Sequence, residues 1–202
     1  MSTEQIKAAV FATSPQMNAL SIFVAVVLGS SLVEFNELLF PPKLSSMAFW
    51  GIVPCYWVGV TGWFGIMAWG RYTPYLDKPT SRVWVTFVMG AWTSVLALMF
   101  FASGLPESIL GYLWGVVVLN IFYWLSTIYR HRDTGSPEPF RLLAIFSPIA
   151  LIAAIAYSIY ALMFSPVPEV VKWVFIIIAF IVVVGYRVAL RWSHIWRPEE
   201  SK

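Results

Sequence analysis

Two glutamates interrupt an apolar stretch near the start of this 202-residue chain. Ser30, Glu34 and Glu37 follow one another at spacings of four and three residues, so an α-helix places them on one face, with Ser31 beside them. A carboxylate in apolar surroundings is costly unless it is paired, hydrated or protonated, so such a face normally lines a bundle interior or a water-filled vestibule. The spacing therefore predicts a stripe that binds cations or protons.

The depth of this stripe follows from the helix that carries it. If the apolar stretch is centred near Leu28, a rise of about 1.5 Å per residue puts Glu34 about 9 Å and Glu37 about 13 Å from the bilayer centre. Alternatively, the outer loop is slightly longer, and both acids lie among the headgroups and pair with Lys43. The two interpretations stay open for Glu37, whereas the depth of Glu34 favours binding.

Asn120 is a further candidate, because it lies inside another apolar run. A buried amide needs hydrogen-bond partners, and within a bilayer the partner is usually another helix. Bonding between helices is therefore favoured over contact with a solute. Tyr123 and Ser126 extend the same polar edge at offsets of three and six residues.

Motifs for catalysis or metal binding are absent from the sequence. His131 and His194 both lie outside the apolar runs, where they cannot hold a haem between helices. There is no Gly-x-Ser-x-Gly, no His-Glu-x-x-His and no phosphate-binding glycine loop. We predict no catalytic residue, no metal site and no cofactor. A lipid-modifying enzyme at the cytoplasmic face is the weakest of three functional hypotheses.

The composition indicates lipid as the solvent of this chain. It is 59% hydrophobic and 11% charged, with a mean hydropathy of +0.76, whereas soluble domains have about 45–50% apolar and roughly 25% charged residues. The basic residues are dispersed over short links rather than gathered in one patch, which argues against nucleic acid as a partner.

Six apolar runs approach or exceed the roughly 20 residues that a transmembrane helix needs. They are Pro15–Phe40, Met47–Trp69, Val83–Ala102, Ile109–Tyr129, Leu142–Phe164 and Val170–Leu190. We therefore predict an all-α polytopic membrane protein, a compact bundle of six transmembrane helices. Its transmembrane domain covers residues 15–190, between an N-terminal cytoplasmic segment 1–14 and a C-terminal cytoplasmic tail 191–202.

Basic residues predict the orientation. Eleven of the 13 Lys and Arg residues fall on one side of the six runs, and only Lys43 and Lys172 fall on the other. The positive-inside rule makes the first side cytoplasmic, with both ends of the chain inside, and we expect the plasma (inner) membrane. Lys172 and Arg187 lie near the ends of the last run, where long side chains reach the headgroups.

Small residues predict where helices approach closely. Gly51, Cys55 and Gly59 recur at intervals of four, and Gly111 and Gly115 repeat that interval in the fourth run. Such spacing supports tight packing or homo-oligomerisation without choosing between them.

Two of the outer turns resemble each other. Ala97–Phe100 precedes Pro106-Glu107, and Ala161–Phe164 precedes Pro168-Glu169. Three hairpin pseudo-repeats are one explanation. The general preference of helix starts for proline and an acid is the other, and it is favoured.

These features predict a channel or transporter-like pathway for a small solute or ion. Its candidate binding residues are Glu34, Glu37, Ser30 and Asn120. The alternative is a non-catalytic subunit that assembles or anchors a larger membrane complex. The expected partners are membrane lipids, together with copies of the same chain or other membrane subunits.

Overall fold

The computed structural model describes residues 15–72, 92–102, 108–134 and 138–195. Within these ranges the chain is all-α, with seven helices and no strand, which confirms the all-α part of the predicted fold class. The helices are α2 (Pro15–Glu34), α3 (Asn36–Leu39), α4 (Met47–Tyr72), Trp92–Ala102, α6 (Ile109–Thr134), α7 (Glu138–Met163) and α8 (Glu169–Ile195).

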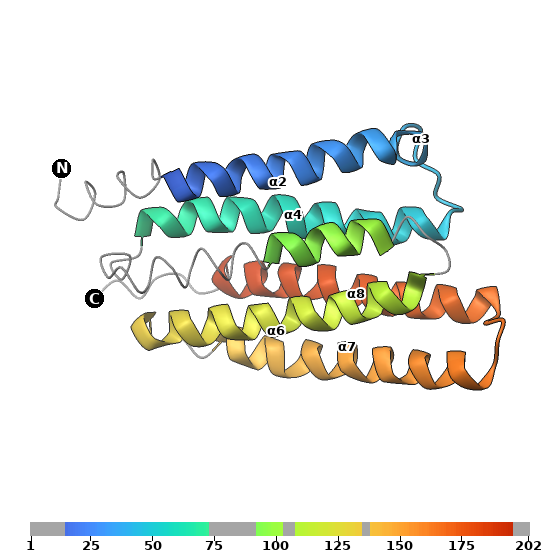
Figure 1. The fold of residues 1–202 in the computed structure, drawn as a ribbon. Helices are drawn as coiled ribbons and strands as arrows, with labels where there is room; N and C mark the ends of the chain where they lie inside the picture. The colour runs from blue at the N-terminus through green and yellow to red at the C-terminus, as the bar shows by residue number, and fades with distance from the viewer. Residues whose placement is uncertain (1–14, 73–91, 103–107, 135–137, 196–202) are drawn as a thin grey trace.

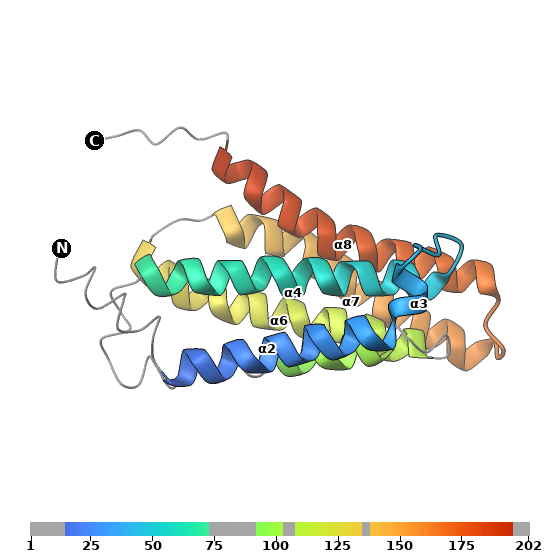
Figure 2. The same cartoon turned by 90° about the horizontal axis from the view of Figure 1, so that it is seen from above.

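The long helices lie side by side and alternate in direction (Figure 1). α7 packs against both α6 and α8, and α4 packs against α8. α2 lies at the edge of the bundle, where it contacts α4 and α3, and the C-terminal part of α8 angles away from the other helices (Figure 2). α2 begins and α8 ends at the same end of the bundle, as the predicted topology requires (Figure 1).

Two helical segments are long and apolar enough to cross a membrane, Arg141–Met163 in α7 and Glu169–Ala189 in α8. Their length and composition point to association with a membrane. The other apolar stretches, among residues described in full, are only 10–17 residues long. They are Ser21–Glu34, Met47–Gly62, Trp92–Ala102 and Ile109–Leu125. Six complete spans therefore remain a proposal.

The first predicted span, Pro15–Phe40, is not one continuous helix. α2 ends at Glu34, and Phe35 departs from helical geometry with φ −102° and ψ 18°. Its amide still donates to the Ser31 carbonyl at 2.9 Å, while its own carbonyl accepts from Leu38 at 3.0 Å and starts the separate turn α3. Glu37 therefore lies on a different helix from Glu34, and the predicted single face is interrupted.

The other helices begin as predicted or extend further. α4 and α6 start at Met47 and Ile109, the predicted first residues of their spans. α6 continues to Thr134 and α8 to Ile195, past the ends of their apolar runs. Hydropathy marks only the part of a helix that suits lipid, whereas backbone hydrogen bonding continues through Arg and other good helix formers. Of the predicted span Val83–Ala102, the structure describes residues 92–102.

Gly59 and Gly115 lie where another helix approaches closely. A Cβ at Gly59 of α4 would lie 2.9 Å from Leu28 Cδ2 in α2 and 3.1 Å from Leu96 Cδ2. A Cβ at Gly115 of α6 would lie 2.7 Å from Met99 Cγ. The helix Trp92–Ala102 is thus wedged between α4 and α6. Of the other predicted packing residues, Gly51 and Cys55 are buried in α4, and a Cβ at Gly111 would lie 3.8 Å from the Ala102 Cβ, an ordinary contact distance.

Candidate functional site

A pocket of about 470 Å³ lies between α2 and the helix Trp92–Ala102. Sites for small molecules typically enclose about 300–1,000 Å³, so this volume is adequate for an organic ligand. α2 and the residue after it contribute Val27, Ser30, Ser31, Glu34 and Phe35, and the facing helix contributes Ala97, Phe100 and Phe101. The pocket therefore brings together three of the polar residues that the sequence singled out.

Ser31 joins α2 to its neighbours beside this pocket. Its side chain is only 6% exposed, and its Oγ donates to the Leu28 carbonyl at 2.8 Å. The Tyr56 Oη of α4 lies 2.8 Å from the same Oγ. Because a serine hydroxyl has one proton, Tyr56 is the donor in this second bond. The Tyr56 ring in turn meets Phe100 edge-on, with centroids 4.7 Å apart.

Ser30 and Glu34 differ in how their oxygens are used. The Ser30 Oγ donates back to the Val26 carbonyl of its own helix at 2.7 Å. Glu34 is exposed on the isolated chain, and among the described residues its carboxylate has no hydrogen bond or ion pair. Of the described residues that line the pocket, Glu34 is the one with an ionisable side chain. A ligand with positive charge would meet an unengaged carboxylate there.

Glu37 stands apart from this group. It lies in the first turn of α3 and is exposed, and it is not on the pocket wall. Lys43 forms no ion pair with Glu34 or Glu37 within the described part of the chain. The loop pairing considered from the sequence is therefore not observed, and the break at Phe35 separates Glu37 from the other candidates.

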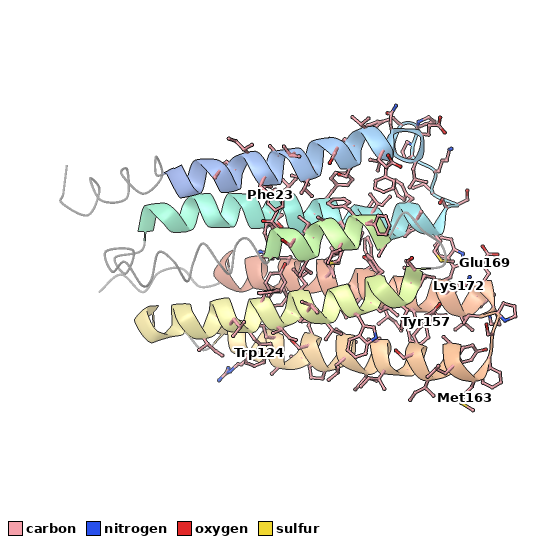
Figure 3. All side chains as sticks on the ribbon, viewed as in Figure 1. Phe23, Trp124, Tyr157, Met163, Glu169 and Lys172 are labelled. Atoms are coloured by element: carbon pink, nitrogen blue, oxygen red, sulfur yellow. The ribbon has the colours of Figure 1, made fainter. Side chains whose placement is uncertain are left out.

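Asn120 is buried between α6 and α7 and lies outside the pocket. Its Nδ2 donates to the Val116 carbonyl at 2.9 Å, and its Oδ1 accepts from the Ser147 Oγ of α7 at 3.2 Å. Trp124 Nε1 donates to the same Ser147 Oγ at 2.9 Å. Trp124 lies towards the end of the bundle where α7 begins, opposite the end that carries Glu169 and Lys172 (Figure 3). The Asn120 side-chain amide therefore joins α6 to α7 through Ser147.

Arg187 of α8 contacts Tyr123 of α6. Its Nη2 and Nε donate to the Tyr123 Oη of α6 at 2.8 and 3.2 Å. The guanidinium carbon is 4.7 Å from the centre of the Tyr123 ring, which stacks on Tyr186 at 5.2 Å. The position near a helix end suggested snorkelling, but the neighbouring tyrosines provide a hydroxyl and an aromatic face for the cation.

Sequence reasoning missed the aromatic part of the pocket. Phe100 and Phe101 lie in a mostly apolar run, and Phe35 lies between Glu34 and Asn36. In a chain so rich in aromatic residues, their types alone carry no signal for a site. Tyr56 is a polar side chain within a span and was the one detectable clue. Comparisons with protein-family models, with curated proteins and with solved structures find no match to this chain. Its function is therefore argued from the site.

Proposed function

We propose that the protein is a six-span membrane protein that binds a small solute or ion beside Glu34 and provides a pathway for it across the plasma membrane. The observation that carries this proposal is the pocket of about 470 Å³ with one unengaged carboxylate. Carboxylates within membrane segments are rare and commonly mark ion or substrate pathways.

Helix length supports six spans. α2 has 20 residues, α4, α6 and α7 have 26 each, and α8 has 27. At about 1.5 Å per residue a 20-residue helix covers about 30 Å, the thickness of the hydrocarbon core. The helix Trp92–Ala102 is the described end of an apolar run that begins in the sequence at Val83.

The distribution of basic residues supports an orientation with both ends of the chain inside. At the end of the bundle where α2 begins (Figure 1), the other long helices carry five arginines within the five residues nearest a helix end. They are Arg71, Arg130, Arg132, Arg141 and Arg191. Lys43 and Lys172 lie towards the opposite end. The positive-inside rule assigns the arginine-rich end to the cytoplasm and the Glu34 pocket to the outer half of the membrane.

An assembly subunit is the second candidate, and the same carboxylate favours it in one respect. α2 lies at the edge of the bundle, and its Val26 and Val33 are 58% and 80% exposed. A cationic side chain on a helix of another subunit would find in Glu34 an unengaged partner.

Flux measurements on reconstituted protein distinguish the two candidates. In liposomes with a pH-sensitive or cation-sensitive dye, we expect flux that falls about tenfold or more in Glu34→Gln, because the charged group on the pathway is lost. Glu37→Gln removes a carboxylate three residues away, outside the pocket, and serves as the matched control with flux close to the unchanged protein. If no proton, inorganic cation or organic solute moves, and a larger membrane protein co-purifies stoichiometrically, the transport proposal is wrong. If flux occurs but Glu34→Gln leaves it unchanged, the site is misassigned.

A further inference from the structure

Among the described lining residues, the pocket offers its ligand hydrogen-bond acceptors but no side-chain donor whose proton is not already directed to a backbone carbonyl. The Ser30 proton is directed to the Val26 carbonyl, and the Ser31 proton to the Leu28 carbonyl. An ionised Glu34 carboxylate has only acceptor oxygens. A ligand that binds these groups must therefore supply the protons itself. An anion would face the Glu34 charge with no donor to stabilise it.

The same wall suits an inorganic cation poorly. Calcium takes six to eight oxygen ligands, and magnesium requires near-ideal octahedral geometry. The pocket contributes one carboxylate and two hydroxyls. In the described ranges of the chain, no group of three or more His, Cys, Asp or Glu side chains is placed to hold a metal ion. A volume of about 470 Å³ also exceeds what a bare ion fills.

The rest of the wall is apolar. Phe35, Phe100 and Phe101 supply rings, and Val27 and Ala97 supply aliphatic surface. An apolar group placed against these side chains leaves water, which favours binding. Aromatic faces also attract a positively charged nitrogen. One carboxylate at the edge of an aromatic wall therefore matches a ligand that is charged at one end and apolar at the other.

We infer that the pocket binds an organic ammonium ion with an apolar body, whose N–H groups donate to Glu34 while the body lies against Phe35, Phe100 and Phe101. This inference rests on the proposed function and names the substrate class of the same site.

Equilibrium binding to the full chain tests the inference without requiring transport. The protein is placed in nanodiscs of phosphatidylcholine, whose quaternary headgroup has no N–H donor. Three probes of matched shape are titrated by calorimetry: 2-phenylethylammonium, 2-phenylethanol and phenylacetate. We expect the ammonium ion to bind about tenfold or more tightly than the alcohol, because a charge-assisted hydrogen bond is added. We expect phenylacetate to bind more weakly than the alcohol.

Variants separate the charge from the apolar wall. Glu34→Gln is expected to bring the affinity for the ammonium ion down to that of the alcohol, whereas Glu37→Gln is expected to preserve the preference. Ala97→Phe reduces the space in the pocket and is expected to weaken both probes. Equal affinities for ammonium ion and alcohol in the unchanged protein would overturn the inference. So would a preference that Glu34→Gln leaves intact.

A lipid amine is a second source of the same chemistry. If nanodiscs that contain phosphatidylethanolamine weaken probe binding in the unchanged protein but not in Glu34→Gln, the ammonium class is supported and a headgroup is its source. Failure of this inference and failure of the proposed function are distinguishable. Ammonium binding without flux contradicts transport alone, whereas Glu34-dependent flux of protons or inorganic cations without ammonium binding contradicts the ligand class alone.

Discussion

At Asn120 both ends of the amide are engaged inside the bundle, one with its own helix and one with Ser147 of α7. The Ser147 hydroxyl connects that amide to the Trp124 indole. Removal of the Ser147 hydroxyl removes both of these hydrogen bonds. At Glu34 the side chain has no such engagement within the described residues. Two polar residues within apolar runs therefore differ in their hydrogen bonding because of what surrounds them.

Ser147→Ala is expected to destabilise the contact between α6 and α7. Hydrogen bonds between membrane helices contribute about 0.6 kcal/mol on average and up to about 1.7 kcal/mol, and we expect the upper part of this range because two bonds are lost. The measurement is reversible unfolding in mixed micelles, with a double-mutant cycle against Asn120→Ala.

Ser158→Ala provides the matched control on the same two helices. The Ser158 Oγ accepts from Trp114 Nε1 at the longer distance of 3.3 Å, and Trp114 is 41% exposed. We expect Ser158→Ala to lower the free energy of unfolding by less than Ser147→Ala does. If Ser158→Ala lowers the free energy of unfolding as much as Ser147→Ala does, the buried hydrogen bonds of Ser147 stabilise the contact no more than the partly exposed bond of Ser158.

At the scale of elements, Trp92–Ala102 depends on small residues in the helices beside it. Gly62 of α4 faces Trp92, which is 5% exposed, and a Cβ at that glycine would come within 2.8 Å of the Trp92 Cη2. A buried indole ring cannot turn away as a flexible chain end can. Gly29 of α2 has nothing within 4 Å of the position that a Cβ would take.

Gly62→Ala is therefore expected to destabilise the protein by about 1–3 kcal/mol, the cost of overpacking a filled core. Gly29→Ala is expected to be neutral or to stabilise by up to about 1 kcal/mol, because alanine is the better helix former. Thermal unfolding of the two variants in the same detergent measures the difference. Equal melting temperatures would show that the Trp92 contact is not tightly packed.

The sequence predicted where several helices begin, but not which helices pack against one another. Met47 and Ile109 begin their helices as predicted, because apolar runs with clear boundaries specify where helices lie. The break at Phe35 has no proline or glycine to announce it. The pairing of α2 with Trp92–Ala102 is a tertiary contact between segments far apart in the chain. Periodicity therefore identified Ser30 and Glu34 as candidates but could not supply the opposite wall of their pocket.

At the scale of the whole molecule, the alternation of helices predicts which surfaces face each side of the membrane. Cys55 is the only cysteine and is fully buried, so it provides a silent background for labelling. Lys43 and Arg141 are both exposed and lie towards opposite ends of the bundle. A single cysteine introduced at either position therefore reports whether that end of the bundle is accessible from outside the cell.

We expect Lys43→Cys to react with a membrane-impermeant maleimide in intact cells, and Arg141→Cys to react only after permeabilisation. This pattern follows from the positive-inside rule. The unchanged chain, with Cys55 alone, is expected to remain unlabelled in both conditions. The reverse pattern would invert the orientation, and labelling of both variants in intact cells would contradict a membrane between the two ends.

The two walls of the pocket are also synthesised at different times. Ala97 follows Glu34 by 63 residues. At roughly 5–20 residues per second, a ribosome needs about 3–13 seconds to synthesise the residues between them. Throughout that interval the nascent α2 carries its acid without the aromatic side chains that will later face it. In the proposed membrane topology, α2 would therefore be inserted with Glu34 before Trp92–Ala102, the opposite wall of its pocket, has been synthesised.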